Sequence, residues 1–350
     1  MGKKVILLLM FSLFTTGILV STRFTIYAGF GEYYSSSSPL KINVMSDKEI
    51  YFTGQNVTIY GNLTFYGELL PDRLVALEID DSSTVPFIFR TLSTGANLTD
   101  TWKIEVTRTF IGDDEGNQLY TANRGTNVWI WVCFRNNHDV ALDAAIAITI
   151  YDETNAPMLA NVLVQSRYLP DRSYNTSYKW KIPTDAQLGN ATIYANAFTE
   201  LPKNEGAAYC PEKSETFLIT SATAMTTETS TDPPTSQTST EGNYNSTFTL
   251  PSQHVRLGNY TVSVAATYKG MWEFFPATNT TQFEIRLLGD INRDAKVDIK
   301  DLVLVIKYFG SYPGHPTEPW NPNADINNDG KVDIKDLVIV IRHFGEVAFP

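Results

Sequence analysis

The chain has 350 residues, of which 43% are hydrophobic and 12% aromatic, enough to build two or three folded cores. Its 27 basic and 38 acidic residues give a formal net charge of -11, and no basic stripe occurs that would neutralise phosphates. This composition argues against a nucleic-acid-binding protein and against a largely disordered chain, and it favours a solvated extracellular surface or cation sites.

The N-terminus has the pattern of an export signal. Lys3 and Lys4 precede an uncharged apolar run from Val5 to Val20, which is short for a membrane-spanning helix. We predict that residues 1–28 are a signal peptide, with a retained N-terminal anchor as the alternative. An uncleaved segment would be the chain's only contact with a membrane, so we expect an extracellular or cell-surface protein.

Two further features fit an exported chain. Cys133 and Cys210 could form a disulfide in an oxidising compartment, and two buried free thiols are the alternative. The chain also carries eight N-glycosylation sequons, which predict a glycoprotein. Their asparagines are Asn56, Asn62, Asn97, Asn175, Asn190, Asn245, Asn259 and Asn279.

Short alternating runs dominate residues 41–286. KINVMSDKEIYFTGQNVTIYGNLTFYG opens the series, and RLVALEID, FIFRTL, WKIEVTRTF, NVWIWVCFRN and AAIAITIYDE continue it. Alternation of apolar and polar residues between Gly- and Asn-containing turns predicts half-buried antiparallel strands. No amphipathic helix is predicted here, and the fold class is mainly β, with tandem sandwiches.

An internal echo suggests how these strands are divided. SYNTSYKWKIPTDAQLGNATIYANAF resembles NYNSTFTLPSQHVRLGNYTVSVAATY, and each copy is predicted to be one hairpin of a separate sandwich. Residues 221–242 are rich in Thr, Ser and Pro and predict a linker. We therefore predict that 41–95 and 243–286 form one discontinuous sandwich, with a second sandwich at 101–220 inserted. Three consecutive units are the alternative.

These strands resemble archaeal secreted and cell-surface proteins built from immunoglobulin-like or macroglobulin-like modules. The resemblance is carried by DKEIYFTGQNVTIYGNLT, IPTDAQLGNATIYANAF and YCPEKSETFLIT. It implies immunoglobulin-like sandwiches with an architectural or adhesive role, and it transfers no catalytic residue.

An acidic sequence occurs twice near the C-terminus. GDINRDAKVDIKDLVLVIKYFG returns as ADINNDGKVDIKDLVIVIRHFG, with oxygen-bearing side chains at positions 1, 3, 5, 9 and 12 of each loop and a backbone carbonyl at position 7. This is the spacing of an EF-hand calcium loop, so we predict two Ca²⁺ ions. The predicted ligands are Asp290, Asn292, Asp294, Lys296, Asp298 and Asp301, and Asp325, Asn327, Asp329, Lys331, Asp333 and Asp336.

Two details separate these loops from a standard EF-hand. Position 12 is Asp, shorter than the usual Glu, and position 6 is Gly330 in the second loop but Ala295 in the first. Because the turn at position 6 favours positive φ, we expect the first loop to be strained and to bind more weakly.

A helix should follow each loop. In the first, Leu302, Val305, Ile306 and Phe309 are spaced to form one buried face, and Leu337, Val340, Ile341 and Phe344 repeat the spacing. Gly310 and Gly345 stand where a C-terminal cap belongs. The unit is therefore a loop and a helix, used twice, and Trp320 in the Pro-rich connector is expected to pack against it.

Residues 289–346 resemble a dockerin module, on the two loops, their offset, the Asp at position 12 and the trailing Gly. The resemblance implies two loop-helix halves related by pseudo-twofold symmetry and a cohesin-like partner. It also implies that helix residues near loop positions 10 and 11 contact the partner. Here these are Ile299, Lys300, Ile334 and Lys335. Metal binding without a partner, or an acidic surface without metal, are the alternatives.

No sequence pattern points to an active site. The four histidines lack zinc-site spacing, and no nucleophile elbow or phosphate-binding Gly loop occurs. Trp129 and Trp131 share one strand face, where a buried core is favoured over a sugar-stacking platform. We predict a non-catalytic surface or scaffold protein. A carbohydrate-binding or glycoside-active component, in contact with a cell-surface glycan, is the alternative.

Overall fold

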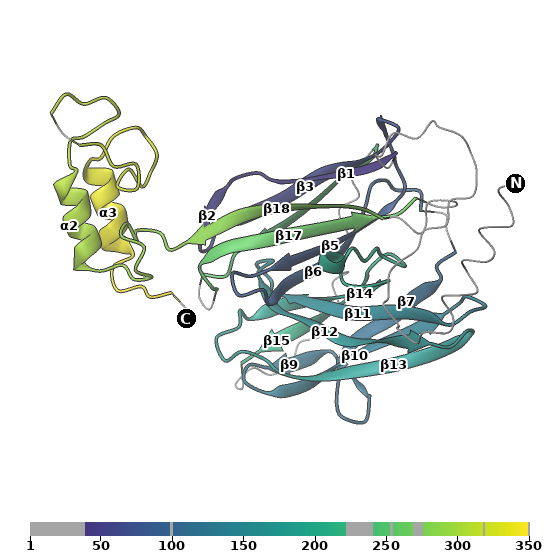
Figure 1. The fold of residues 1–350 in the computed structure, drawn as a ribbon. Coiled ribbons are helices and arrows are strands. Elements are labelled where there is room, and N and C mark those ends of the chain that lie inside the picture. The colour runs from purple at the N-terminus through teal and green to yellow at the C-terminus, as the bar shows by residue number, and fades with distance from the viewer. Residues whose placement is uncertain are drawn as a thin grey trace, which may run out of the picture. The chain divides into compact units, whose positions relative to one another are not determined.

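The computed structural model describes residues 39–98, 101–221, 241–252, 255–268, 276–317 and 319–348, which belong to one compact unit (Figure 1). The predicted signal segment 1–28 and most of the predicted linker 221–242 lie outside these residues. Within them the protein is mainly β, as predicted, and ends in two short helices. No helix in the described ranges is long and apolar enough to cross a membrane.

Two sheets combine strands from both ends of the β-rich region. The sheet we call A has the order β1-β3-β16, with β4 paired to β3, and sheet B has the order β2-β18-β17-β5-β6. The strands are β1 (Leu40–Ser46), β2 (Ile50–Phe52), β3 (Asn56–Phe65), β4 (Glu68–Leu69), β5 (Leu74–Asp80), β6 (Pro86–Ser93), β16 (Asn243–Thr249), β17 (Gly258–Ala266) and β18 (Ala277–Arg286). These two sheets combine residues 40–93 with residues 243–286, while the predicted division into domains stays a prediction.

The strands between them form two other sheets. Sheet C has the order β13-β10-β7-β8, and sheet D has the order β12-β11-β14-β15-β9. The strands are β7 (Ile104–Gly112), β8 (Gln118–Leu119), β9 (Thr121–Asn123), β10 (Asn127–Asn136), β11 (Leu142–Tyr151), β12 (Pro157–Tyr168), β13 (Arg172–Lys181), β14 (Gly189–Phe198) and β15 (Lys213–Thr220), with one 3₁₀ turn at Pro202–Asn204. Independent folding of 101–220 stays a prediction, as does the immunoglobulin-like assignment.

Each pair of sheets encloses its own apolar core. Sheets A and B bury one cluster that includes Ile59, Leu77 and Phe283, and sheets C and D bury another that includes Ile130, Ile148 and Phe217. Alternation in β1, β3 and β10 places every second side chain in these cores, as the period of two predicts.

Sheets B and D also pack against each other, which corrects the expectation of half-buried strands. Strands β5, β6, β11 and β14 are buried on both faces over most of their length. A small cluster that includes Phe89, Ala147 and Phe198 fills the contact. Apolar residues at consecutive positions, as in β11, are the sequence signal of a strand buried on both faces.

Buried polar bonds join the two pairs of sheets at this contact. The guanidinium of Arg90 forms an ion pair with Glu212, 2.6 Å apart, with side-chain exposures of 9% and 3%. The hydroxyl of Thr149 accepts from the N–H of Phe89 at 2.7 Å and donates to its carbonyl at 3.0 Å. Because these groups satisfy each other away from water, they hold the two pairs of sheets in one arrangement.

The echoed sequences are not hairpins. Within the first copy, β13 lies in sheet C and β14 in sheet D; within the second, β16 lies in sheet A and β17 in sheet B. Each copy therefore crosses from one sheet to another, from C to D or from A to B, through a Pro-containing loop. Gly189 and Gly258 do adopt positive φ, 125° and 111°, at the start of the second strand, as the turn requires.

The predicted disulfide is not formed, and both cysteines are free thiols. Cys210 is buried in the core between sheets C and D, where its sulfur accepts from the N–H of Val106 at 3.4 Å. Cys133 alternates with the core residues Val132 and Phe134 along β10, so it lies on the opposite face of sheet C. A bridge through the sheet is geometrically impossible.

Trp129 and Trp131 do not lie in the core that we expected. They alternate with Val128, Ile130 and Val132 along β10 and are half-buried on the outer face of sheet C. The indole nitrogen of Trp131 donates to the carbonyl of Asp113 at 3.0 Å, which fixes that ring against the turn after β7. The core position on this sheet is taken by Trp180, which is 6% exposed.

Candidate metal centre

Two nine-residue helices follow the acidic loops, and the loops themselves begin them. Helix α2 runs from Ile299 to Lys307 and α3 from Ile334 to Arg342, side by side in Figure 1. Asp298 caps α2 by accepting from the N–H of Lys300 at 2.7 Å, and the carboxylate of Asp301 accepts from the N–H of Asp298 at 2.9 Å. The same capping box stands at Asp333 and Asp336.

The carboxylate at position 1 accepts hydrogen bonds from backbone N–H groups of its own loop. Asp290 accepts from the N–H of Asp294 at 3.1 Å and of Ala295 at 2.9 Å. Asp325 accepts from Asp329 and Gly330 at the same two distances. Two residues of each loop, at positions 4 and 6, take positive φ: 59° and 66° in the first loop, 57° and 88° in the second. Ala295 therefore adopts the turn after all, at a conformational cost that Gly330 does not carry.

The Asp at position 12 is the most enclosed group of each loop. Asp301 and Asp336 are fully buried. One oxygen of Asp301 accepts from Ile291 and Asn292 at 2.8 and 3.1 Å, and the other accepts from Asp298. Asp336 repeats these bonds with the N–H groups of residues 326, 327 and 333. Backbone donors thus hold the shorter Asp inside each loop.

The remaining predicted ligands gather around the same loops. Asn292 accepts from the N–H of Asp294 at 2.9 Å, and its amide donates to the carboxylate of Asp294 at 3.1 Å. Asn327 and Asp329 match this in the second loop. The carbonyls of Lys296 and Lys331, at position 7, receive no hydrogen bond from any described residue. They remain available as ligands.

Lysines at position 11 bind the carboxylates at position 5. The ammonium of Lys300 lies 2.8 Å from Asp294, and that of Lys335 lies 2.7 Å from Asp329. These bonds lower the pKa of both carboxyl groups and raise the pKa of both lysines. Among the described residues, accordingly, no three acidic, imidazole or thiol groups are arranged as a ready metal cluster. The oxygens of each loop are shared between peptide N–H groups and a lysine.

The donor set nevertheless fits a hard divalent cation. Burial raises the pKa of Asp290, backbone N–H groups oppose the rise, and the charges of Asp301 and Asp294 add to it. Burial likewise raises the pKa of Asp325. Carboxylates crowded in this way repel each other, and a Ca²⁺ ion held by oxygens at positions 1, 3, 5, 7, 9 and 12 would remove that repulsion.

Each loop is bonded to the end of the other repeat. The N–H of Val297 donates to the carbonyl of Glu346 at 2.9 Å, and its carbonyl accepts from Gly345 at 2.8 Å. Val332 bonds in the same way to Ser311 and Gly310, at 3.0 and 2.8 Å. Both glycines have positive φ, 86° at Gly310 and 91° at Gly345, but the C-caps are Tyr308 and His343, so the glycines lie two residues beyond the predicted cap position. Each repeat therefore makes the same backbone hydrogen bonds to the other, in a pseudo-twofold arrangement.

The core of this module is small. It contains Val297, Val305, Val332 and Val340, all fully buried, and Trp320 packs against it as predicted. The predicted buried helix face is only partly correct. Val305 and Val340 are inside, but Ile306 and Ile341 are 56% and 55% exposed. A helix of nine residues beside so little core cannot bury apolar residues around its whole circumference.

The exposed apolar residues form a stripe on each helix. On α2 the stripe is Ile299, Val303, Ile306 and Phe309, and on α3 it is Ile334, Val338, Ile341 and Phe344. Ile299 and Ile334, predicted from the resemblance to meet a partner, are 59% and 58% exposed at the start of each stripe. The other members were missed, although apolar residues on every side of a short helix signal an uncovered face.

The predicted glycosylation sites differ in access. Asn56, Asn97, Asn175 and Asn259 are exposed, whereas Asn62, Asn190, Asn245 and Asn279 are half-buried. The amide nitrogen of Asn279, which a glycan would modify, donates to the carbonyl of Ile42 at 3.0 Å. Glycosylation stays a prediction, and the exposed asparagines meet its steric requirement best.

Comparison with protein families identifies one region of the chain. Residues 288–345 match the dockerin type I domain, and the match covers both loops and both helices. The boundaries agree with the 289–346 expected from sequence, so the resemblance to a dockerin is confirmed. No curated protein matches the chain, and the resemblance to archaeal surface proteins stays a prediction.

Solved structures share only remote likeness with it. The DNA glycosylase AlkC of Pseudomonas fluorescens is 9% identical over 35% of this chain and 32% of its own, with a TM-score of 0.26. A cycloisomaltooligosaccharide glucanotransferase of Paenibacillus sp. is 11% identical over 34% and 14%, also at 0.26. The C-terminal domain of wzt is 7% identical over 37% and 86%, at 0.29. The chain thus spans a third or less of the first two.

Proposed function

We propose that the dockerin domain binds one Ca²⁺ ion in each loop and docks a cohesin-type partner, while the β-rich region serves as a non-catalytic body at the cell surface or outside the cell. The observation that carries the proposal is the pairing of two like acidic loops with two exposed apolar stripes in one domain. Dockerin domains occur in extracellular or cell-surface proteins and imply docking to cohesins in cellulosome-like assemblies.

Calcium would act on this domain through the loops. The side chains that would hold it are the predicted ligands of positions 1, 3, 5, 9 and 12, joined by the carbonyls of Lys296 and Lys331. Because Val297 and Val332 tie each loop to the end of the other repeat, an ion in either loop stabilises the whole domain. A core this small makes metal an important part of its stability.

The docking surface follows from the same geometry. Each stripe starts at position 10, beside the position 11 lysine, and both helices present the same arrangement. When Ca²⁺ takes the carboxylates at position 5, Lys300 and Lys335 lose their partner inside the loop and become available to an acidic rim on the cohesin. Calcium would thus both order the surface and free its charges.

The test measures docking of the full chain to a panel of purified cohesin modules, with calcium and with EGTA. We expect binding in calcium that is lost in EGTA, and lost again when Asp290 and Asp325 are both replaced by Ala. Ile299→Asp with Ile334→Asp should abolish docking but leave calcium binding intact. Docking that survives chelation would refute the coupling, and retention by the Ile variants would place the partner elsewhere.

A non-catalytic body is tested separately. A panel of polysaccharides, assayed for product and for binding, should show no product formation by the full chain. Reaction products that appear with the wild-type protein and disappear when the sandwiches are mutated would replace the proposal with an enzyme.

A further inference from the structure

A cavity lies in the β-rich region, outside the residues that match the dockerin domain. Its volume is about 970 Å³, at the upper end of the ~300–1,000 Å³ that small-molecule sites occupy. One wall comes from sheets C and D, through Arg124, the 152–158 turn and the 181–187 loop. The other wall comes from Gly54 and the end of β16, residues 249–252.

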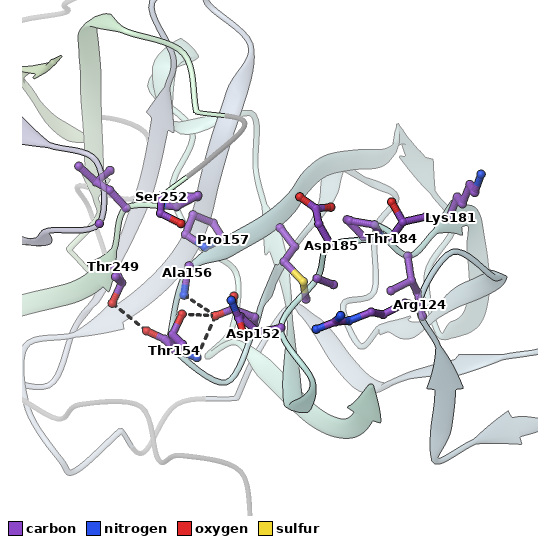
Figure 2. A pocket seen from close by; sticks show the side chains of 18 residues that line it. Arg124, Asp152, Thr154, Ala156, Pro157, Lys181, Thr184, Asp185, Thr249 and Ser252 are labelled. Atoms are coloured by element: carbon purple, nitrogen blue, oxygen red, sulfur yellow. Dashed lines mark hydrogen bonds between the residues drawn. The ribbon is translucent and has the colours of Figure 1, made fainter. Parts of the chain in front are cut away.

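The two walls are bonded to each other, so the cavity is preformed. The N–H of Thr249 donates to the carbonyl of Asn155 at 2.9 Å, and its hydroxyl donates to the carbonyl of Thr154 at 2.7 Å. The amide of Asn155 donates back to the carbonyl of Thr247 at 2.7 Å. Figure 2 shows the bond from Thr249 to Thr154 closing one side of the pocket. A ligand would meet a rigid site and would lose little affinity to ordering it.

Arg124 brings a positive charge into this cavity, which the carboxylates of Asp152 and Asp185 also line. Its Nε is buried and has no hydrogen-bond partner among the described residues. The backbone around it is fixed, because Arg124 donates its N–H to the carbonyl of Thr220 at 3.0 Å and Gly125 donates to Ile182 at 2.9 Å. Figure 2 shows its guanidinium directed toward Asp152, while the ammonium of Lys181 points the other way. A buried guanidinium nitrogen without a partner is costly, and a planar carboxylate satisfies it with two parallel bonds.

The rest of the lining suits hydroxyl groups. Asp152 uses its Oδ1 to accept from the N–H groups of Thr154 and Ala156 and from the Thr154 hydroxyl, at 2.7–3.0 Å. Its Oδ2 has no partner within the described ranges and can accept from a ligand hydroxyl. Side chains of Thr184 and Ser252 add donors on the rim, and prolines with Met158 form apolar patches between them.

We propose that this cavity binds an acidic carbohydrate, with the carboxylate of a uronic acid residue on Arg124 and its hydroxyls on Asp152 and the rim. The lining joins a guanidinium whose Nε has no partner among the described residues to a carboxylate acceptor, a combination that suits the carboxylate and hydroxyls of one sugar residue. The site is separate from the dockerin domain and would let the body hold a polysaccharide while the domain holds a partner.

Calorimetry of the full chain in EGTA tests the proposal with three probes: a glucuronic acid tetramer, the same tetramer with its carboxylates methyl-esterified, and an acidic peptide. We expect the acid to bind and the ester to bind at least tenfold more weakly. Arg124→Gln should lower the affinity for the acid about tenfold or more, a loss of ~1.4 kcal/mol. It should not change the affinity for the ester. Arg135→Gln, which alters an exposed arginine elsewhere on sheet C, is the matched control and should leave binding unchanged.

A second variant guards against misfolding of the first. Thr184→Trp places a bulky side chain on the exposed rim and should block the acid without lowering the melting temperature. Failure of the wild-type chain to bind the acid, equal affinity for acid and ester, or full binding by Arg124→Gln would each overturn the proposal. Binding of the acidic peptide alone would replace the sugar with a peptide ligand. Because the assay contains EGTA, its outcome is independent of calcium binding and docking.

Discussion

The two loop-helix repeats have nearly the same hydrogen bonds but different residues at position 6. The carboxylate of position 1 accepts from the N–H of position 6 at 2.9 Å in both loops, whether that residue is Ala295 or Gly330. Both residues have positive φ. The carboxylates therefore determine the shape of each loop, while the residue at position 6 determines only the conformational free-energy cost of adopting that shape.

Removal of the position 12 carboxylate should have the largest effect on calcium affinity. Asp301→Ala removes a fully buried group that accepts three backbone N–H bonds, and Asp336→Ala does the same in the other loop. Hydrogen bonds to charged groups contribute about 1.5–3 kcal/mol each, so we expect at least a hundredfold loss of calcium affinity in the altered loop. Calcium titration of the full chain by calorimetry measures it.

The control for this experiment is Asp114→Ala, an exposed acidic residue on the turn after β7. It should leave both affinities unchanged. Because each loop is bonded to the end of the other repeat, each single variant should also lower the thermal stability of the whole domain. Affinities within threefold of wild type would mean that position 12 does not hold the ion.

An exchange of the residues at position 6 should change the calcium affinities of the two loops in opposite directions. A non-glycine residue in the left-handed region costs about 1–2 kcal/mol, so Ala295→Gly should raise the affinity of the first loop about five- to thirtyfold. Gly330→Ala should lower that of the second by a similar factor. Calorimetry on the two single variants and on the double exchange gives both values. If the first loop does not gain affinity while the second loses it, strain at this position is not what separates the loops.

The position 11 lysines should have the smallest effect. Lys300→Met and Lys335→Met each free a position 5 carboxylate from an exposed ion pair, and exposed pairs contribute little. We expect calcium affinity to rise about twofold to threefold in the altered loop, less at high salt. Lys307→Met, on the same helix as Lys300, is the control. A fall in affinity would show that these lysines support the metal-binding conformation rather than compete with the ion.

Much of this architecture could be predicted because it depends on local spacing. The offsets of Asp290, Asp294 and Asp301 define a loop, and the Asp at position 9 caps the helix that follows. Alternation in β1, β3 and β10 likewise places the cores correctly. In each case the residue's environment is decided by its neighbours within about twelve positions.

The rest depended on contacts between distant segments. Strand β11 is buried on both faces because sheet B packs against sheet D. The residues near Ile148 in the sequence do not identify sheet B as the packing partner. The echoed segments cross between sheets because their strands pair with β3 and β10, far away in sequence. Ile306 was predicted to be buried, and its exposed stripe was not predicted, because the spacing of the stripe is as regular as that of the buried face.

The central claim is that the acidic loops are calcium sites, and the number of ions bound per chain tests it most directly. Calorimetric titration of the full chain with Ca²⁺ should give two sites in the wild type, one in Asp301→Ala, one in Asp336→Ala and none in the double variant. Equal heats of binding in the wild type and the double variant, or no heat in the wild type, would contradict it.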